Sequence, residues 1–206
     1  MIEPHWEKSL WRKGYQHVAG IDEAGRGALA GPLVSAAVVF DPTKPIPKGI
    51  NDSKLLSPKR RQALALQIIK TAKNFSWAQI SARQIDQKGI SWATQEAFYQ
   101  TVLDLEEEPD FIFLDAYRAA KIKNISQQAL IKGDQKILSV AAASILAKVF
   151  RDWLMAKTYD ALYPIYNFKK HKGYGTKEHI TIIKKVGICP IHRKSYLNPL
   201  WQTEDG

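Results

Sequence analysis

Cysteine is almost absent from this sequence, with Cys189 the only one among 206 residues. A single cysteine excludes a disulfide within the chain and any zinc site built from several cysteines. Long hydrophobic runs are absent too, since none approaches the roughly 20 residues that span a bilayer. The charged residues 1–14 also lack the apolar core of a signal peptide. We therefore expect a cytoplasmic protein without a membrane partner.

Acidic residues are outnumbered by basic ones. The chain has 30 Lys and Arg against 20 Asp and Glu, which gives a formal net charge of +10 at pH 7. Because the basic residues are spread along the chain rather than confined to one tail, they favour a folded basic surface. Nucleic acid is the commonest cellular polyanion that such a surface attracts.

No internal repeat, low-complexity tract or linker divides the chain. We expect one domain over residues 1–206, in which about 1–15 form a lead-in packed onto the domain. Residues from about 158 to 206 are expected to form a helical carboxyl-terminal part. Nothing in the sequence indicates an oligomer interface, so we expect a monomer.

Hydrophobic periodicity predicts the strands and helices. The first two strands are joined by a short link with three glycines, which favours an antiparallel hairpin. The apolar run 111–115 is typical of a strand covered on both faces. The expected strands are 17–23, 32–40, 75–82, 111–115 and 125–131, and the expected helices are 57–73, 91–107, 139–157 and one from the cap Thr176 to Gly187.

Two adjacent acids, Asp22 and Glu23, end the first expected strand and are followed by Gly25-Arg26-Gly27. Carboxylates supply hard oxygen ligands for a divalent cation, and a glycine-flanked arginine can approach a phosphate or sugar closely. In an ideal strand the two acids point to opposite faces, so they share a site only if the strand ends or bulges there. The alternative is an ordinary tight turn with solvated acids.

Two further acids, Asp115 and Asp134, come at or just beyond the ends of later strands. Strand ends are where open α/β sheets place ligands. Four gathered carboxylates repel one another unless cations neutralise them, and an all-oxygen set favours Mg²⁺ or Mn²⁺ over zinc. Two such ions would clamp the oxygens of an in-line displacement, which predicts phosphodiester hydrolysis by activated water.

Taken in order, the motifs resemble those of the ribonuclease HII family, and the match extends from about residue 17 to 196. Any one motif is weak, but the ordered set is specific. The motifs are Gly20-Ile21-Asp22-Glu23-Ala24-Gly25-Arg26-Gly27, Asn51-Asp52-Ser53-Lys54, Leu114-Asp115, Lys132-Gly133-Asp134, Ala141-Ala142-Ala143-Ser144-Ile145 with Ala147-Lys148 and Arg151-Asp152, His171-Lys172-Gly173-Tyr174-Gly175-Thr176, and His192-Arg193.

The resemblance implies an α/β ribonuclease H-like fold, a mixed five-stranded sheet flanked by helices with a helical carboxyl-terminal part. It also implies an endoribonuclease that hydrolyses the RNA strand of RNA/DNA hybrids and incises at ribonucleotides embedded in duplex DNA. The products would carry 3′-hydroxyl and 5′-phosphate ends. Two-metal catalysis with Mg²⁺ or Mn²⁺ is implied as well.

The resemblance further implies roles for individual residues. Gly25, Arg26 and Gly27 are similar to the element that senses the ribose 2′-hydroxyl. Tyr174 resembles a tyrosine that packs on the neighbouring deoxyribose. The metal-binding carboxylates would be Asp22, Glu23, Asp115 and Asp134, and the contacts to backbone phosphates would be Asn51, Ser53, Lys54 and Ser144.

One position departs from the family pattern. The family commonly has glycine after the third aspartate, where this chain has Ala116. An extra methyl group could crowd the site, yet the aspartate itself is present, so we expect activity to survive.

Several singled-out residues also have structural interpretations. Tyr174 could anchor a loop, and Lys54 and Lys148 could be solvated lysines. Arg151-Asp152 is expected to be a surface or structural ion pair. The basic opening turn of the expected helix 57–73, residues 59–61, is expected to be a solvated face. Of the histidines, His171, His179 and His192 are expected to be surface or capping residues rather than ligands or bases.

Two other functions compete with the nuclease hypothesis. A non-catalytic binder of hybrid or structured nucleic acid would use the basic face alone, but its four carboxylates would repel the ligand. A related metal-dependent DNA nuclease of the same fold is expected to lack the Gly25-Arg26-Gly27 and Lys172–Thr176 motifs, and both are present.

Overall fold

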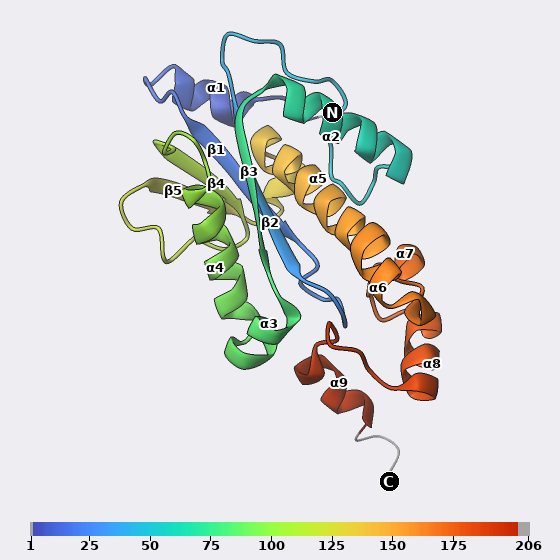
Figure 1. The fold of residues 1–206 in the computed structure, drawn as a ribbon. Coiled ribbons are helices and arrows are strands. Elements are labelled where there is room, and N and C mark those ends of the chain that lie inside the picture. The colour runs from blue at the N-terminus through green and yellow to red at the C-terminus, as the bar shows by residue number, and fades with distance from the viewer. Residues whose placement is uncertain (1, 202–206) are drawn as a thin grey trace.

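The centre of the fold is one sheet of five strands in the order β3-β2-β1-β4-β5, seen in a computed structural model that describes residues 2–201 (Figure 1). β1 pairs antiparallel with β2 and parallel with β4, so the sheet is mixed. The expected hairpin and α/β fold class are confirmed. The strands are β1 (Val18–Ala24), β2 (Leu33–Phe40), β3 (Ala72–Ile80), β4 (Phe111–Asp115) and β5 (Ser126–Leu130).

Helices cover both faces of the sheet, with α2 and α5 on one side and α3 and α4 on the other (Figure 1). The side chains of β2 alternate between the two faces: Ala36 and Val38 pack with α5, whereas Ala37 and Val39 pack with α4. This alternation gives the sheet a core on each face. These helices are α2 (Pro58–Thr71), α3 (Ala82–Lys88), α4 (Ile90–Leu103) and α5 (Leu138–Trp153).

The helix α5 lies very close to β1. Residues 138–147 of α5 are all buried, and most of them are small. A Cβ atom on Gly20 of β1 would overlap the backbone of Ser139, so only glycine allows this approach. The close fit fixes where the middle of α5 stands relative to the end of β1.

The lead-in forms a helix, α1 (His5–Trp11), that packs onto the domain as expected. Its Leu10 joins a core cluster with Val18 and Phe113. Its buried Glu7 accepts hydrogen bonds from the backbone N–H and the hydroxyl of Ser139, both at 2.7 Å. A carboxylate at this position interacts favourably with the amino terminus of α5.

The carboxyl-terminal part is helical and follows α5 without a break. One helix was not expected, α3, which starts at a capping box formed by Ser81 and Gln84. Residues 202–206 lie outside the described part. The elements are η2 (Leu154–Tyr159), α6 (Asp160–Leu162), η3 (Pro164–Tyr166), α7 (Phe168–His171), α8 (Lys177–Val186) and α9 (Lys194–Trp201).

Candidate active site

A cavity of about 260 Å³ opens where two parallel strands separate. The pairing of β1 with β4 ends at Ile21 and Leu114, so the next residues of both strands face a gap. Residues from several parts of the chain meet around this gap. They come from β1 and the link after it, the loop before α2, the end of β4, α5 and the loop before α8. They are Asp22, Glu23, Ala24, Gly25, Arg26, Ser53, Lys54, Asp115, Ser144, Lys148 and Tyr174.

Asp22 and Glu23 line the same cavity although β1 continues to Ala24 without a bulge against β2. The expected requirement for a strand end is met on one side only, because pairing with β4 stops at Ile21. Past that point the backbone of β1 has no neighbour on the β4 side. Both carboxylates can therefore reach the gap.

Burial and mutual repulsion perturb these acids. Burial raises the pKa of Asp22 well above its usual value, and the neighbouring charge of Glu23 raises it further. Burial also raises the pKa of Glu23 to about 7, with the Arg26 guanidinium opposing the rise and Asp115 adding to it. Raised carboxyl pKa values of this origin mark a place where a cation would be stabilised.

The other two acids lie side by side. Asp115 ends β4 and accepts a hydrogen bond from the N–H of Gly133 at 2.7 Å. Asp134 follows in the short helix η1 (Gly133–Gln135), and burial together with the Asp115 charge raises its pKa. The Lys54 ammonium lies 3.5 Å from Asp134 Oδ2. Asp22, Glu23 and Asp115 thus line the cavity, whereas Asp134 is not among the lining residues and reaches the cavity only through its contact with Lys54.

The donor set fits a hard divalent cation, because it consists of carboxylate oxygens that repel one another and already attract the Lys54 ammonium. Among residues 2–201, however, no three His, Cys, Asp or Glu side chains stand in an arrangement that would hold an ion. Such a cation would have to draw the carboxylates closer together than they stand here.

The Gly25-Arg26-Gly27 link is held in place by contacts to other parts of the domain. Gly25 has φ +92°, and a Cβ atom there would overlap the Arg151 side chain. The Arg26 guanidinium donates to Thr94 Oγ1 at 3.0 Å and lies 5.0 Å from the centre of the Tyr117 ring. Gly25 and Arg26 line the cavity, whereas Gly27 is exposed next to it.

The loop before α2 meets α5 at the cavity. Ser53 and Ser144 are buried, and their hydroxyl groups are 3.0 Å apart. Asn51 is not among the lining residues, and its side-chain oxygen accepts from the N–H of Asp52 at 2.9 Å. Ser53, Lys54 and Ser144 therefore line the cavity, but Asn51 does not.

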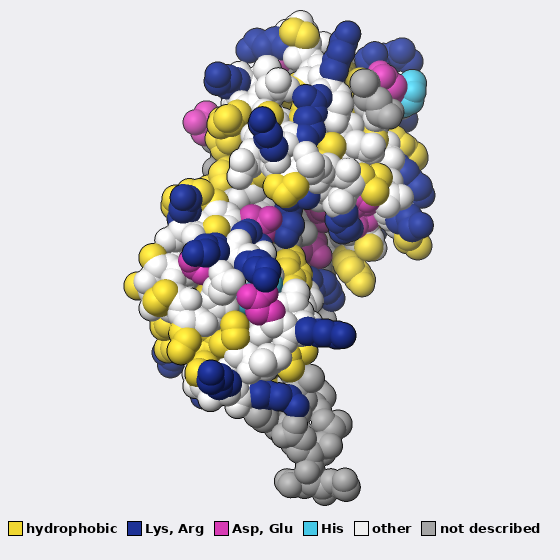
Figure 2. Space-filling model, turned by 90° about the vertical axis from the view of Figure 1, so that its right-hand side faces the viewer, with side chains coloured by type: hydrophobic (Ala, Val, Ile, Leu, Met, Phe, Trp, Pro, Cys, Tyr) yellow, Lys and Arg dark blue, Asp and Glu magenta, His cyan; other side chains and the backbone are white. Residues whose placement is uncertain are grey.

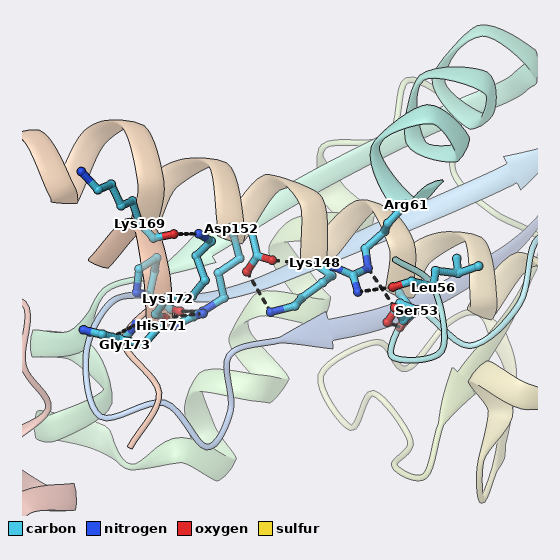
Figure 3. Close-up of polar contacts among 12 residues, drawn as sticks. Ser53, Leu56, Arg61, Lys148, Asp152, Lys169, His171, Lys172 and Gly173 are labelled. Atoms are coloured by element: carbon cyan, nitrogen blue, oxygen red, sulfur yellow. Dashed lines mark hydrogen bonds and ion pairs between the residues drawn. The ribbon is translucent and has the colours of Figure 1, made fainter. Parts of the chain in front are cut away.

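A row of polar contacts joins this loop to α5 (Figure 3). Arg61 donates from Nε to the carbonyl of Ser53 at 2.8 Å and from Nη2 to that of Leu56 at 2.9 Å. Asp152 lies between Arg61, 3.8 Å away, and Lys148, 2.8 Å away. The expectation that residue 61 belongs to a solvated face is wrong, because its long side chain is needed to tie the loop to the helix.

Tyr174 faces two cations of α5. The Lys148 ammonium lies 4.9 Å and the Arg151 guanidinium 5.0 Å from the centre of its ring. Arg151 is fully buried and donates to the carbonyls of Ala30, Pro32 and Lys172 at 2.9–3.0 Å. Arg151 and Asp152 are thus not the ion pair expected from their adjacency, because each bonds to a different part of the chain.

In the space-filling view, acidic side chains gather at the narrow middle of the molecule and lysine and arginine side chains lie around them (Figure 2). This arrangement suits a polyanion bound over a cation site. Residues 19–202 match the family model Ribonuclease HII. The chain belongs to the ribonuclease HII family. It is therefore a metal-dependent ribonuclease, and its family hydrolyses RNA in RNA/DNA hybrids.

Relatives and solved structures agree with this membership. The ribonuclease HII of Caldicellulosiruptor saccharolyticus is 47% identical over 191 residues, which are 93% of this chain and 92% of that protein. The crystal structure of ribonuclease H2 from Pyrococcus horikoshii has a TM-score of 0.73 at 27% identity, covering 91% of this chain and 98% of that one. The ribonuclease HII of Archaeoglobus fulgidus, solved in complex with PCNA, has a TM-score of 0.72 at 29% identity, covering 86% and 94%.

Three histidines of this ribonuclease HII chain differ from expectation. His171, His179 and His192 are all buried, with 7%, 0% and 2% of their surfaces exposed. They are not surface residues, because they pack around Phe168 in the carboxyl-terminal part.

Within residues 2–201 no helix is long and apolar enough to cross a membrane.

The departure at Ala116 has a structural consequence. Ala116 adopts φ +55°, in the left-handed region that glycine occupies without strain. Its N–H donates to Leu130 O at 3.0 Å, so the conformation is fixed by pairing with β5. Alanine is therefore held in a strained conformation beside Asp115.

Replacing Ala116 by glycine is expected to raise the free energy of unfolding by about 1 kcal/mol, because relief of left-handed strain exceeds the added entropy of the unfolded chain. Urea unfolding would measure the change. Ala120→Gly is the control, since Ala120 is exposed and has no positive φ. A loss of stability in both variants would contradict the assignment of strain to Ala116.

Proposed function

We propose that this chain incises duplex DNA at single embedded ribonucleotides as well as cleaving the RNA strand of RNA/DNA hybrids. The observation that carries the proposal is one cavity shared by Asp22, Glu23, Asp115, Arg26 and Tyr174. A reaction centre and groups able to contact a sugar thus lie next to each other. Cleavage would leave 3′-hydroxyl and 5′-phosphate ends.

We assign the metal ligands to the four carboxylates. When bound, Mg²⁺ or Mn²⁺ ions would lower the pKa of a water molecule and neutralise charge on the reacting phosphate. The buried and mutually repelling acids favour such binding, because a cation offsets both penalties. The ligands would be Asp22, Glu23, Asp115 and Asp134.

Recognition of the ribose is assigned to the link after β1 and to Tyr174. Gly25 lets the link pass over the buried Arg151 side chain, the open space at Gly27 leaves room for a sugar, and Arg26 is kept in place by Thr94 and Tyr117. The 2′-hydroxyl both donates and accepts hydrogen bonds, so backbone groups of Gly25, Arg26 and Gly27 can identify it. Tyr174 supplies a flat ring in the same cavity for the neighbouring deoxyribose.

Backbone phosphates would bind along the basic side of the cavity. Lys54, Ser53 and Ser144 offer an ammonium and two hydroxyl groups there, and none of them needs to contact a base edge. We also assign Asn51 to the phosphate contacts, because it belongs to the same loop as Ser53 and Lys54. Cleavage should therefore depend little on base sequence.

The test is incubation with a DNA duplex that contains one ribonucleotide, with Mg²⁺, with Mn²⁺ and with a chelator. We expect metal-dependent incision on the 5′ side of the ribonucleotide, while an all-DNA duplex of the same sequence stays intact. If only a long hybrid were cleaved, the proposal of activity at single ribonucleotides would be wrong. Cleavage of the all-DNA duplex would instead favour the related DNA nuclease.

We further propose that the protein works as a monomer in the cytoplasm. Light scattering at the concentrations used for activity would check the monomer, and a doubled mass would contradict it.

A further inference from the structure

The three buried histidines form a connected group with Cys189. His179 Nε2 lies 3.0 Å from His192 Nε2, and the rings of His171 and His179 are stacked with centres 4.2 Å apart. The backbone N–H of Cys189 lies 2.9 Å from His192 Nδ1. Phe168 contacts all three rings. None of these histidines lines the active-site cavity.

The partners fix which nitrogen carries the proton. His179 Nδ1 lies 3.0 Å from the carbonyl of Tyr174, which can only accept, so the proton is on Nδ1 and Nε2 must accept. His192 Nε2 must then donate to it, which leaves His192 Nδ1 free to accept from Cys189. Burial lowers the pKa of both His179 and His192 to about 4, so both rings are neutral at neutral pH.

His171 is fixed in the same way. Its Nε2 lies 2.7 Å from the carbonyl of Tyr166 and therefore carries the proton. Its Nδ1 accepts from the N–H of Gly173 at 3.2 Å. Burial lowers the pKa of His171 too, which keeps Nδ1 an acceptor.

These bonds end on the loop that carries Tyr174. One histidine binds the N–H of Gly173 and another binds the carbonyl of Tyr174. From the other side, the carbonyl of Gly173 accepts from Leu29 and Ala30, at 2.8 and 3.1 Å. The loop is thus held between the histidines and the link after β1.

We infer that His171 and His179 are positioning residues that set the place of the Tyr174 ring in the active site. The histidines touch neither the cavity nor the carboxylates, and their polar contacts lead to the backbone on each side of the tyrosine. The inference rests on the proposed function only in taking Tyr174 as a substrate contact. Cleavage of long RNA/DNA hybrid is used to test it, so failure at single ribonucleotides would leave the test intact.

The matched variants are His179→Asn and His179→Gln. The amide nitrogen of asparagine can take the place of Nδ1 and donate to the Tyr174 carbonyl, whereas the side-chain oxygen of glutamine takes the place of Nε2 and accepts from His192. Both variants lose the stacked ring, so both should lose stability alike. Only His179→Gln should lower kcat/KM on the hybrid, by three- to tenfold at temperatures where both proteins are folded.

The second step removes the tyrosine side chain. In a Tyr174→Ala background, exchanging His179→Asn for His179→Gln is expected to change kcat/KM by less than twofold, because nothing remains to be positioned. An equal loss of activity in the two single variants, or a difference that persists without the tyrosine ring, would overturn the inference.

A second pair covers the case in which the His179 variants do not fold. In His171→Asn the side-chain oxygen can still accept from Gly173, whereas His171→Gln places its amide away from that N–H. We expect the same three- to tenfold difference between these variants on the hybrid. Equal activity of this pair would overturn the inference for His171.

Discussion

Replacing Glu23 by glutamine is expected to lower kcat on an RNA/DNA hybrid by a factor on the order of 10³ while making the metal-free protein more stable. The loss of activity follows if Glu23 is a metal ligand, since a neutral amide is a poor ligand for Mg²⁺. Loss of one ligand from a set that acts together removes most of the activity of the whole set. Single-turnover cleavage with Mg²⁺ in excess would measure it.

The gain in stability follows from the raised pKa. An unfolded glutamate ionises near pH 4.5, whereas burial holds the pKa of Glu23 at about 7 in the folded protein. The folded protein therefore loses stability as the pH rises from 4.5 to 7, and the full penalty is present above 7. A shift of this size corresponds to about 3 kcal/mol at most.

The stability of Glu23→Gln relative to the unchanged protein should accordingly depend on pH. With a chelator present, its advantage should be largest at pH 8 and should vanish below about pH 4.5. Thermal unfolding at several pH values measures this. Glu106→Gln is the control, because Glu106 is exposed. A variant that is less stable than the unchanged protein at pH 8 would refute the argument, as would full cleavage activity.

The central part of the fold was predictable because its sequence signals are local. The apolar run 111–115 matches β4, and the glycine-rich link matches the bend between β1 and β2. Asp22 follows the last residue of β1 that pairs with β4, and Asp115 ends β4, so the topology of the sheet brings both acids to one gap. Fold class and most of the cavity therefore follow from periodicity and motif order.

The arginines were not predictable in the same way. Arg61 and Arg151 look like solvated helix residues in sequence, because charged side chains usually are. Each is buried since it donates to backbone carbonyls of a loop distant in sequence. Such partners depend on which loops meet in the folded chain, and no spacing rule identifies them.

The histidines were missed for a related reason. His179 and His192 are 13 residues apart, and their contact requires the turn after α8 to bring them together. The capping box of Ser81 and Gln84, in contrast, was a local signal for α3.

The metal ligands and substrate contacts stay predictions, as does the single-domain organisation.

Replacing Arg151 by methionine is expected to lower the free energy of unfolding by about 3 kcal/mol or more. The guanidinium is fully buried and satisfies three carbonyls, of Ala30, Pro32 and Lys172. Each buried acceptor left without a donor costs about 1–3 kcal/mol. For a chain of this size, such a loss corresponds to a fall in Tm on the order of 10 °C.

The measurement is thermal unfolding of Arg151→Met, of Arg151→Lys and of Arg83→Met, in which an exposed arginine is lost. Lysine keeps the charge but cannot satisfy three separate carbonyls, so its loss should nearly equal that of methionine. Arg83→Met should change stability by less than about 0.5 kcal/mol. If Arg151→Lys proved as stable as the unchanged protein, the charge beside Tyr174 rather than the three hydrogen bonds would explain why Arg151 is buried.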